Sequence, residues 1–237
     1  MMISNSVKQW FIQINLFCIF ILQTIISCEK LNARISLKVQ GIGFHRDLIY
    51  QIHVDQFIEE CYIAIYLQLP SALYANINEL IHLRRLNIST ICVHEKADIE
   101  LFAEKAQIQN VIICSSLNRV GCALKLPIHQ RYQYANDSNK YMNITLPDPI
   151  LLLGCRKKIE GYRVSKLDLC SPCVTIVPKW REIPYVTDKK DLWTVPVGET
   201  TMLCVVTYTT FLLTMLCTIY LIRIVWESIP KQHLKHE

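Results

Sequence analysis

The chain has 237 residues, half of them hydrophobic, and a formal net charge of +5 at pH 7. Its 25 basic residues are scattered among 20 acidic ones without a long basic run interleaved with aromatic residues, which excludes nucleic acid as an expected partner. Eleven cysteines are many for a cytosolic protein and ordinary for a secretory one. The length allows one sizeable domain or two small ones.

The N-terminus is apolar from Trp10 to Ile26, after a basic residue at Lys8. This pattern predicts a signal peptide over residues 1–28, with cleavage after Ser27 or Cys28. An uncleaved anchor is the alternative. Either one delivers the following chain to the lumen of the endoplasmic reticulum.

Three N-glycosylation sequons follow, and all of them lie in the segment expected to be lumenal. Their acceptor residues are Asn87, Asn136 and Asn143. Because a sequon recurs by chance, the three sites serve as consistency checks on this topology.

Residues 29–177 are predicted to form a mainly β, sandwich-like domain. Cys61–Leu69 is the clearest strand, because alternate residues place one apolar set on a single face and Pro70 ends the run. Many short strands separated by turns indicate a β-sandwich. The other predicted strands are Arg34–Val39, Leu48–Val54, Ile108–Ser115, Cys122–Tyr134 and Met142–Leu146.

Two short helical segments and one extended segment complete the expected lumenal part. Asn76 with Glu79 three residues later resembles a capping box, which predicts a short helix through Arg84. Asp98–Lys105 is expected to form one or two helical turns. Residues 178–201 contain three prolines and are predicted to be an extended lead from the domain to the membrane.

Met202–Ile222 contains 21 residues and no charge. As a helix it is about 31 Å long, which matches the hydrocarbon core of a bilayer. Arg223 and Trp226 follow it, and basic residues prefer the cytoplasmic side. The segment is therefore predicted to be a single transmembrane helix in type I topology, with residues 223–237 as a short cytosolic tail.

Four threonines lie on one face of this predicted helix, at spacings of three, four and four residues. They are Thr207, Thr210, Thr214 and Thr218. Such a stripe can contact a partner helix in the membrane. Alternatively, each hydroxyl bonds its own helix one turn back.

Seven cysteines lie outside the two hydrophobic segments and the cleavage region. In an oxidising lumen they are expected to form disulfides, and an odd number leaves one thiol free or paired elsewhere. Cys170 and Cys173 have the spacing of a redox motif. However, Val174–Pro178 is predicted to be a strand, whereas such a motif precedes a long helix, so a structural role is favoured.

The sequence predicts no catalytic, cofactor or metal site. It contains no HExxH, GxSxG or phosphate-binding loop. Asp98 and Glu100 could suit a metal, but a solvated helix start explains them as well. Cysteine-based zinc binding is disfavoured because no second pair has ligand spacing.

Several segments, in order, resemble the PIG-X family. The resemblance is strongest at Leu126–His129 with Arg131 and Tyr132, which is similar to the family motif LP-hydrophobic-H-x-RY. It covers about Glu60 to Ile222. The other matching segments are Cys61–Pro70, Ala72–Tyr74, Glu79–Leu80, Asn87–Ser89, Asp98–Glu100, Asp148–Pro149, Leu151–Cys155, Ser171–Cys173, Trp180 and Val195–Gly198.

This resemblance implies a non-catalytic subunit of the glycosylphosphatidylinositol (GPI) mannosyltransferase I complex in the endoplasmic reticulum membrane. PIG-X-like proteins bind and stabilise a multispan catalytic subunit, PIG-M. That subunit transfers the first mannose, in α1,4 linkage, from dolichol-phosphate-mannose to glucosaminyl-phosphatidylinositol on the lumenal side. The absence of a catalytic cluster in the sequence agrees with such a role.

Two partner contacts are hypothesised: the threonine stripe, and a lumenal surface at His129, Arg131 and Tyr132. Strand alternation places His129 and Arg131 on one face and Tyr132 on the other, so a purely local role is the alternative for this trio. Cys92 and Cys114 have no obvious counterparts in the family. The disulfide candidates are Cys61, Cys122, Cys155, Cys170 and Cys173.

Two other functions fit the topology. The first is a type I cell-surface receptor or adhesion protein with an immunoglobulin-like ectodomain, although the Cys…Trp…Cys core signature is not evident. The second is a lumenal thiol oxidoreductase that uses Cys170 and Cys173.

Overall fold

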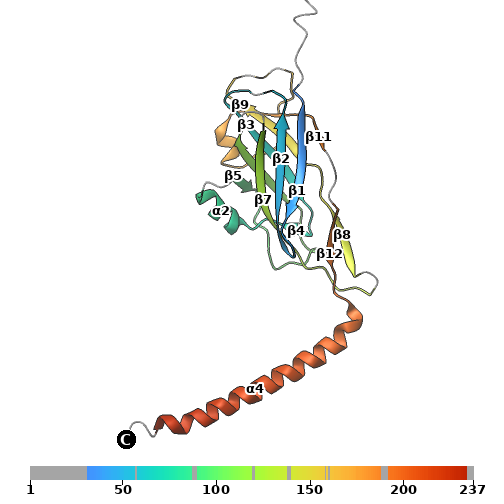
Figure 1. Ribbon diagram of the computed structural model, residues 1–237, viewed down its shortest axis with the longest axis vertical. Coiled ribbons are helices and arrows are strands. Elements are labelled where there is room, and N and C mark those ends of the chain that lie inside the picture. The colour runs from blue at the N-terminus through green and yellow to red at the C-terminus, as the bar shows by residue number, and fades with distance from the viewer. Residues whose placement is uncertain are drawn as a thin grey trace, which may run out of the picture.

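The computed structural model describes residues 31–56, 58–86, 90–118, 121–137, 140–157, 159, 161–187 and 192–233. The predicted signal peptide (1–28) and the sequon at Asn87 lie outside these residues. Within them, two β-sheets form a sandwich, and one long helix follows at the C-terminal end (Figure 1). This architecture confirms the predicted fold class.

The first sheet contains five strands in the order β11-β1-β2-β7-β4. All neighbours are antiparallel except β11, which runs parallel to β1. β7 ends at Gln130, four residues before the expected Tyr134, and the backbone N–H of Arg131 still bonds the carbonyl of Ala72, next to β4. The strands are β1 (Ala33–Gln40), β2 (His45–Val54), β4 (Leu73–Tyr74), β7 (Gly121–Gln130) and β11 (Tyr185–Thr187).

The second sheet also contains five strands, in the order β10-β9-β3-β6-β5, and every pair in it is antiparallel. The strand predicted at Cys61–Leu69 has those bounds in the structure. The strands are β3 (Cys61–Leu69), β5 (Thr90–Val93), β6 (Gln109–Ser116), β9 (Ile150–Cys155) and β10 (Trp180–Glu182).

The main core lies between the two sheets. Each sheet contributes alternate residues, such as Leu48, Tyr50 and Ile52 from β2 and Ile63 and Ile65 from β3, all at most 2% exposed. Burial of such side chains is the largest favourable contribution to folding. The alternation that predicted the strands is therefore the pattern that fills the core.

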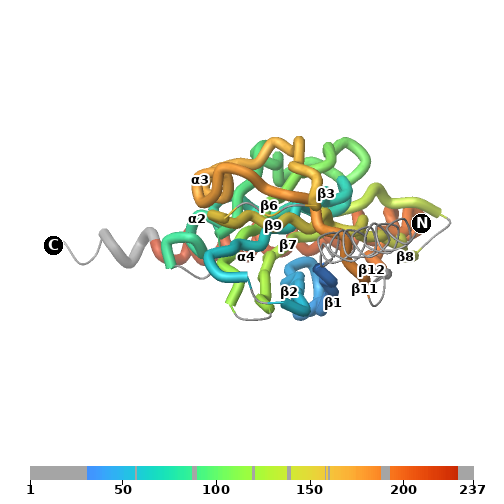
Figure 2. Tube along the Cα trace, turned by 90° about the horizontal axis from the view of Figure 1, so that it is seen from above, coloured from blue at the N-terminus to red at the C-terminus, as the bar shows by residue number. Residues whose placement is uncertain are grey.

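A second, smaller core covers the outer face of the second sheet. The segment around α3 (Cys173–Ile176) packs there, and Figure 2 shows it on the side away from the first sheet. The prediction of a strand at Val174–Pro178 is therefore wrong, because Cys173–Ile176 forms a one-turn helix. Its geometry places the buried Cys173 against β6, where it is disulfide-bonded to Cys114.

The described part of the predicted extended lead, residues 178–187 and 192–201, contains three strands that pair with other strands of the protein. β10 and β11 extend the two sheets, and β12 (Leu192–Pro196) pairs with β8 (Tyr141–Thr145) in a two-stranded sheet. Trp193 and Val195 of β12 are at most 3% exposed and belong to the main core. Prolines punctuate this segment, but the buried side chains of Ile183, Trp193 and Val195 hold it against the sandwich.

The sandwich continues directly into the C-terminal helix. The N–H of Asn136 bonds the carbonyl of Gly198, and the N–H of Thr200 bonds the carbonyl of Asn136. A 3-10 turn, η1 (Thr200–Met202), then leads into α4 (Leu203–His233). Backbone hydrogen bonds therefore fix the start of α4 to one end of the sandwich, which we call the helix-side end (Figure 1).

Among the described residues, α4 supplies the one helix that is long and apolar enough to cross a membrane, over Thr200–Ser228. It includes the predicted span 202–222 and continues as a helix through the first part of the predicted tail. No part of the apolar window is buried against the rest of the protein. The cover for its surface must come from lipid or from another chain.

Candidate functional site

Two histidines face each other across neighbouring strands at the helix-side end of the first sheet. His45 opens β2, and His129 lies directly opposite it in β7. Both point away from the main core, because their neighbours Leu48 and Ile128 occupy the alternate, inward positions. Their ring centroids are 4.6 Å apart. The strand register alone thus brings together two residues that are 84 positions apart in the sequence.

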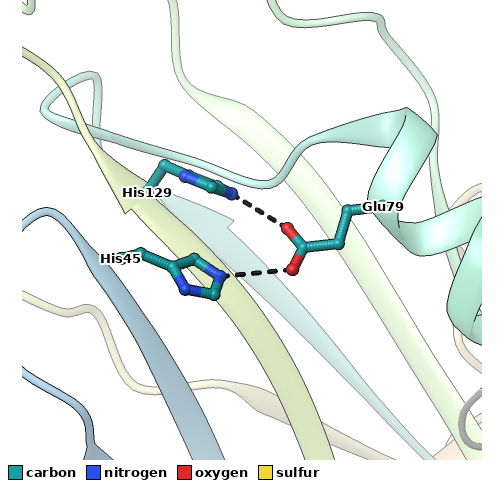
Figure 3. A group of neighbouring side chains, drawn as sticks. All are labelled: His45, Glu79 and His129. Atoms are coloured by element: carbon teal, nitrogen blue, oxygen red, sulfur yellow. Dashed lines mark hydrogen bonds and ion pairs between the residues drawn. The ribbon is translucent and has the colours of Figure 1, made fainter.

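Glu79 reaches both histidines from α2 (Ile77–Arg85). Its Oε1 lies 3.2 Å from Nε2 of His45, and its Oε2 lies 2.9 Å from Nε2 of His129 (Figure 3). As predicted, Asn76 caps the helix, and its side chain accepts a hydrogen bond from the N–H of Asn78. The carboxylate expected to complete a capping box is directed instead at the histidine pair. We call His45, Glu79 and His129 the histidine–glutamate cluster.

Aromatic and basic side chains hold this cluster in place. Tyr74 of β4 stacks on the His129 ring at 5.1 Å, and the guanidinium of Arg131 lies 4.6 Å from the Tyr74 ring. Nη1 of Arg131 donates hydrogen bonds to the carbonyls of Asp98 and Leu101. Burial lowers the pKa of Arg131 from its ordinary value. Arginine nevertheless stays charged at neutral pH, so the guanidinium fixes the 98–101 loop against β4.

Of the three residues in the sandwich predicted to contact a partner, the structure leaves one on the surface. Tyr132 is 69% exposed, whereas Arg131 is 4% exposed and His129 is half-buried in the cluster. Internal carbonyl groups and Tyr74 occupy the side chain of Arg131, which disfavours it as a contact residue, and its contact with a partner stays a prediction. His129 and Tyr132 remain candidates.

Tyr132 belongs to a group of exposed apolar side chains at the helix-side end. Phe44 contacts Tyr132 with ring centroids 5.0 Å apart, and Phe102 contacts Tyr134 at 4.8 Å. A hydrogen bond from the N–H of Ala103 to the carbonyl of Tyr132 joins the two pairs. Ile42, 92% exposed, lies in the turn just before Phe44. We call Ile42, Phe44, Phe102, Tyr132 and Tyr134 the helix-side patch.

The turn that presents Ile42 requires glycine. Gly41 and Gly43 have φ angles of +99° and +78°, which residues with a side chain rarely adopt. The patch also lies close to the start of α4, because Tyr134 is two residues from Asn136, whose backbone bonds Gly198 and Thr200. Exposed apolar groups gathered in this way mark contact surfaces.

The threonine stripe of α4 bonds its own helix. The hydroxyls of Thr210, Thr214 and Thr218 each donate to a carbonyl one turn earlier, at 2.8–3.0 Å. These bonds satisfy the hydroxyls without a partner. They leave the methyl face of the stripe exposed, so a packing contact there stays a prediction.

Six of the nine described cysteines form three disulfides: Cys61–Cys155, Cys92–Cys170 and Cys114–Cys173. The candidate set was wrong about Cys122, which is a free thiol in β7, and it omitted Cys92 and Cys114. Because Cys170 and Cys173 pair with different strands, they do not form a redox pair with each other.

The two described sequons differ in their surroundings. Asn143 is exposed on β8, opposite Thr194 of β12. Asn136 is half-buried, and its backbone forms the junction with α4. Glycosylation of these residues and of Asn87 stays a prediction.

The structure defines a class before any comparison: a disulfide-bonded β-sandwich joined directly to one helix suited to crossing a membrane. The chain belongs to the PIG-X / PBN1 family, whose model matches residues 42–226. That match spans most of the sandwich and most of the apolar helix.

Named relatives are similar over most of their length. A human protein is 28% identical over 188 residues, which cover 74% of this chain and 73% of that protein. A rat protein is 26% identical over 197 residues, 78% of each. Both are named "GPI alpha-1,4-mannosyltransferase I, stabilizing subunit". This name describes an accessory subunit rather than a catalytic one.

Proposed function

We propose that this protein is the non-catalytic stabilising subunit of GPI mannosyltransferase I. The observation that carries the proposal is the family match over residues 42–226, together with relatives that bear this name. Because the match includes both the sandwich and the helix, it favours this role over the receptor reading, which rested on topology alone.

The proposed partner is a multispan, PIG-M-like catalytic subunit. It would transfer the first α1,4-linked mannose from dolichol-phosphate-mannose to glucosaminyl-phosphatidylinositol. The present chain would bind the folded form of that partner and not its unfolded form, which shifts the partner's folding equilibrium toward the native state. This role requires a stable surface and no catalytic group.

The proposed location is the endoplasmic reticulum membrane, with the sandwich in the lumen. Three disulfides fit an oxidising compartment. Arg223 and Lys231 follow the apolar part of α4, and basic residues favour the cytoplasmic side. Both features support type I topology.

We propose two contact regions on the partner-facing side. The first is α4, whose apolar surface has no cover from its own chain. The second is the helix-side patch, because a surface beside the start of a transmembrane helix lies at the level where a multispan partner exposes its lumenal loops. Tyrosine and phenylalanine provide large contact areas at small cost in side-chain entropy.

Depletion of this protein, with two readouts in the same cells, tests the proposal. We expect both the amount of the catalytic subunit and the surface level of a GPI-anchored reporter to fall, and re-expression of the full chain to restore both. A transmembrane reporter without a GPI anchor is the matched control and should not change. Normal levels of catalytic subunit and GPI reporter after depletion would contradict the proposal.

A further inference from the structure

We propose that the histidine–glutamate cluster is a binding site for a divalent transition metal, with zinc as the ion it fits best. This inference goes beyond the proposed function and does not depend on it. His45, Glu79 and His129 each offer one ligand atom, and these atoms all lie within 4.8 Å of one another. They come from three elements, β2, α2 and β7, that meet at this point.

The spacing of the ligand atoms is close to that of a zinc site. With metal–ligand bonds of about 2.0–2.1 Å, the ligand atoms of a tetrahedral site are roughly 3.3 Å apart. The two nitrogen–oxygen distances are 3.2 Å to Oε1 and 2.9 Å to Oε2 of the same carboxylate, and one ligand atom from each of the three residues lies within 4.8 Å of the others. Metal binding would therefore have to draw the ligand atoms together from within 4.8 Å to about 3.3 Å. The side chain of His45 is 54% exposed, which leaves it room to rotate toward the other two ligands.

The ligand types decide the class of metal. Imidazole nitrogen suits zinc and its neighbours among the transition metals, whereas calcium and magnesium prefer oxygen ligands throughout. Two histidines with one glutamate form a known zinc ligand set. The glutamate carboxylate supplies a negative charge against the dication, and three protein ligands leave a fourth position for water or for a side chain of a partner.

The surroundings hold these ligands in position before any ion binds. The register of β2 with β7 fixes the histidine pair, Tyr74 stacks on the His129 ring, and the Asn76 cap sets where α2 begins. His129 and Glu79 have side-chain exposures of 25% and 30%, and His45 has 54%. The site is thus shielded on one side and open to solvent on the other, which lets an ion enter.

A bound ion would join α2 to the first sheet. In the absence of metal, one carboxylate accepts hydrogen bonds from two imidazole N–H groups. Metal binding would replace both hydrogen bonds by coordination and move the remaining ring proton of each histidine to Nδ1. Because the folded chain alone presents the three ligands together, zinc should stabilise it against unfolding.

Zinc titration of the full chain in detergent micelles tests this inference. The protein carries a purification tag without histidine, and His233→Gln with His236→Gln in every variant removes the two histidines near the C-terminus as competing ligands. Calorimetry should show one zinc per chain, zinc should raise the midpoint of thermal unfolding, and Co²⁺ should give the visible absorption of a nitrogen- and oxygen-ligated ion. Magnesium at the same concentration should have no effect.

Ligand variants and a matched control complete the test. We expect His129→Gln and Glu79→Gln to weaken zinc binding about tenfold or more, and His53→Gln, on the same strand as His45, to leave it unchanged. Near-ultraviolet circular dichroism of each variant without metal shows whether it is folded. Glu79→Gln keeps the volume of the side chain, so it provides the test if His129→Gln does not fold. Absence of saturable zinc binding, or equal binding by wild type and both ligand variants, would overturn the inference.

Discussion

The two sheets of the sandwich share one core but are stabilised differently. The second sheet carries the three disulfides found among the described residues, and two of them fasten the α3 segment to its outer face. In the first sheet, the described cysteine is Cys122, a free thiol. Hydrogen bonds, ring stacking and the histidine–glutamate cluster fix its helix-side end instead.

This difference separates a structural region from a contact region. The α3 segment on the second sheet is a one-turn helix with irregular chain around it, so it has few backbone hydrogen bonds of its own. Disulfides therefore fix it to the sheet. The first sheet leads to the helix-side patch and to the start of α4, where exposed apolar groups gather. Changes in the second sheet should therefore alter stability, and changes in the patch should alter partner binding.

Loss of a disulfide in the second sheet should have the largest effect. Cys114 and Cys173 are at most 1% exposed and are separated by 59 residues in the sequence. Replacing both by alanine should lower the free energy of unfolding by about 4 kcal/mol, since the bond closes a long loop. Urea unfolding followed by tryptophan fluorescence measures this. Cys122→Ala is the matched control, and an equal loss in both would contradict the assignment.

A smaller loss is expected where the outer layer touches β9. A Cβ atom at Gly154 would lie 2.3 Å from Cγ2 of Val177 and 2.9 Å from the Trp180 ring. Gly154→Ala should therefore cost about 2–3 kcal/mol by overpacking. Gly43→Ala, where the added atom meets nothing within 4 Å, should cost only about 1 kcal/mol for its positive φ. The same urea experiment compares the free energies of unfolding of the two variants. Equal losses would mean that Val177 and Trp180 move aside without cost, which would contradict the tight packing of the outer layer.

At the helix-side end, Arg131→Ala should cost about 2 kcal/mol. It removes the charged donor to the carbonyls of Asp98 and Leu101 and the contact with Tyr74. Arg156→Ala is the control, because its ion pair with Glu60 is exposed and worth little. Hydrogen exchange should also rise in the 98–105 loop of the first variant. Unchanged exchange there would mean that the arginine does not fix this loop.

For Cys122 the expected effect concerns the reactivity of its thiol and not the folded structure. Burial raises the pKa of its thiol from 9.0 to about 11. At pH 9 the native thiol should therefore react with iodoacetamide about fiftyfold more slowly than the same cysteine in unfolded chain, because the thiolate is the nucleophile. Peptide mass spectrometry measures both rates, and similar rates would contradict the burial.

The same raised pKa has a consequence for stability. Between about pH 9 and pH 11 the unfolded chain releases the Cys122 proton, whereas the folded chain retains it. The contribution of this group to stability is therefore intact below pH 9 and is lost as the pH rises through that window. Tyr185, whose pKa burial raises from 10.0 to about 12, acts in the same direction at higher pH.

Sequence patterns predicted what depends on neighbouring residues. The alternation of Cys61–Leu69 gave β3 with its bounds, and Asn76 gave the start of α2. The α3 helix was missed because the pairing of Cys173 with Cys114 has no local signal. The prolines of residues 178–201 predict an extended lead to the membrane and not the strand β12. The burial of β12 depends on the packing of Trp193 in the main core, whose other residues are distant in the sequence.

The histidine–glutamate cluster lay beyond prediction for the same reason. His45, Glu79 and His129 are separated by 34 and 50 residues, and the register of β2 with β7 decides that they meet. The sequence did contain one signal, an acidic residue in the first turn of a capped helix. A capping box is the local interpretation of this residue, whereas its contacts in the structure are long-range.

The most direct test is the half-life of the catalytic mannosyltransferase subunit in cells that lack this protein. Re-expression of the wild-type chain should lengthen that half-life. Re-expression of Ile42→Ser with Tyr132→Ser should not, although this variant should unfold within about 1 kcal/mol of wild type because the two side chains are 92% and 69% exposed. Val186→Ser, a change of an exposed apolar residue on β11, should act as wild type. If the wild-type chain leaves the half-life unchanged, the stabilising role is wrong; if the patch variant restores it fully, the role stands and the contact surface lies elsewhere.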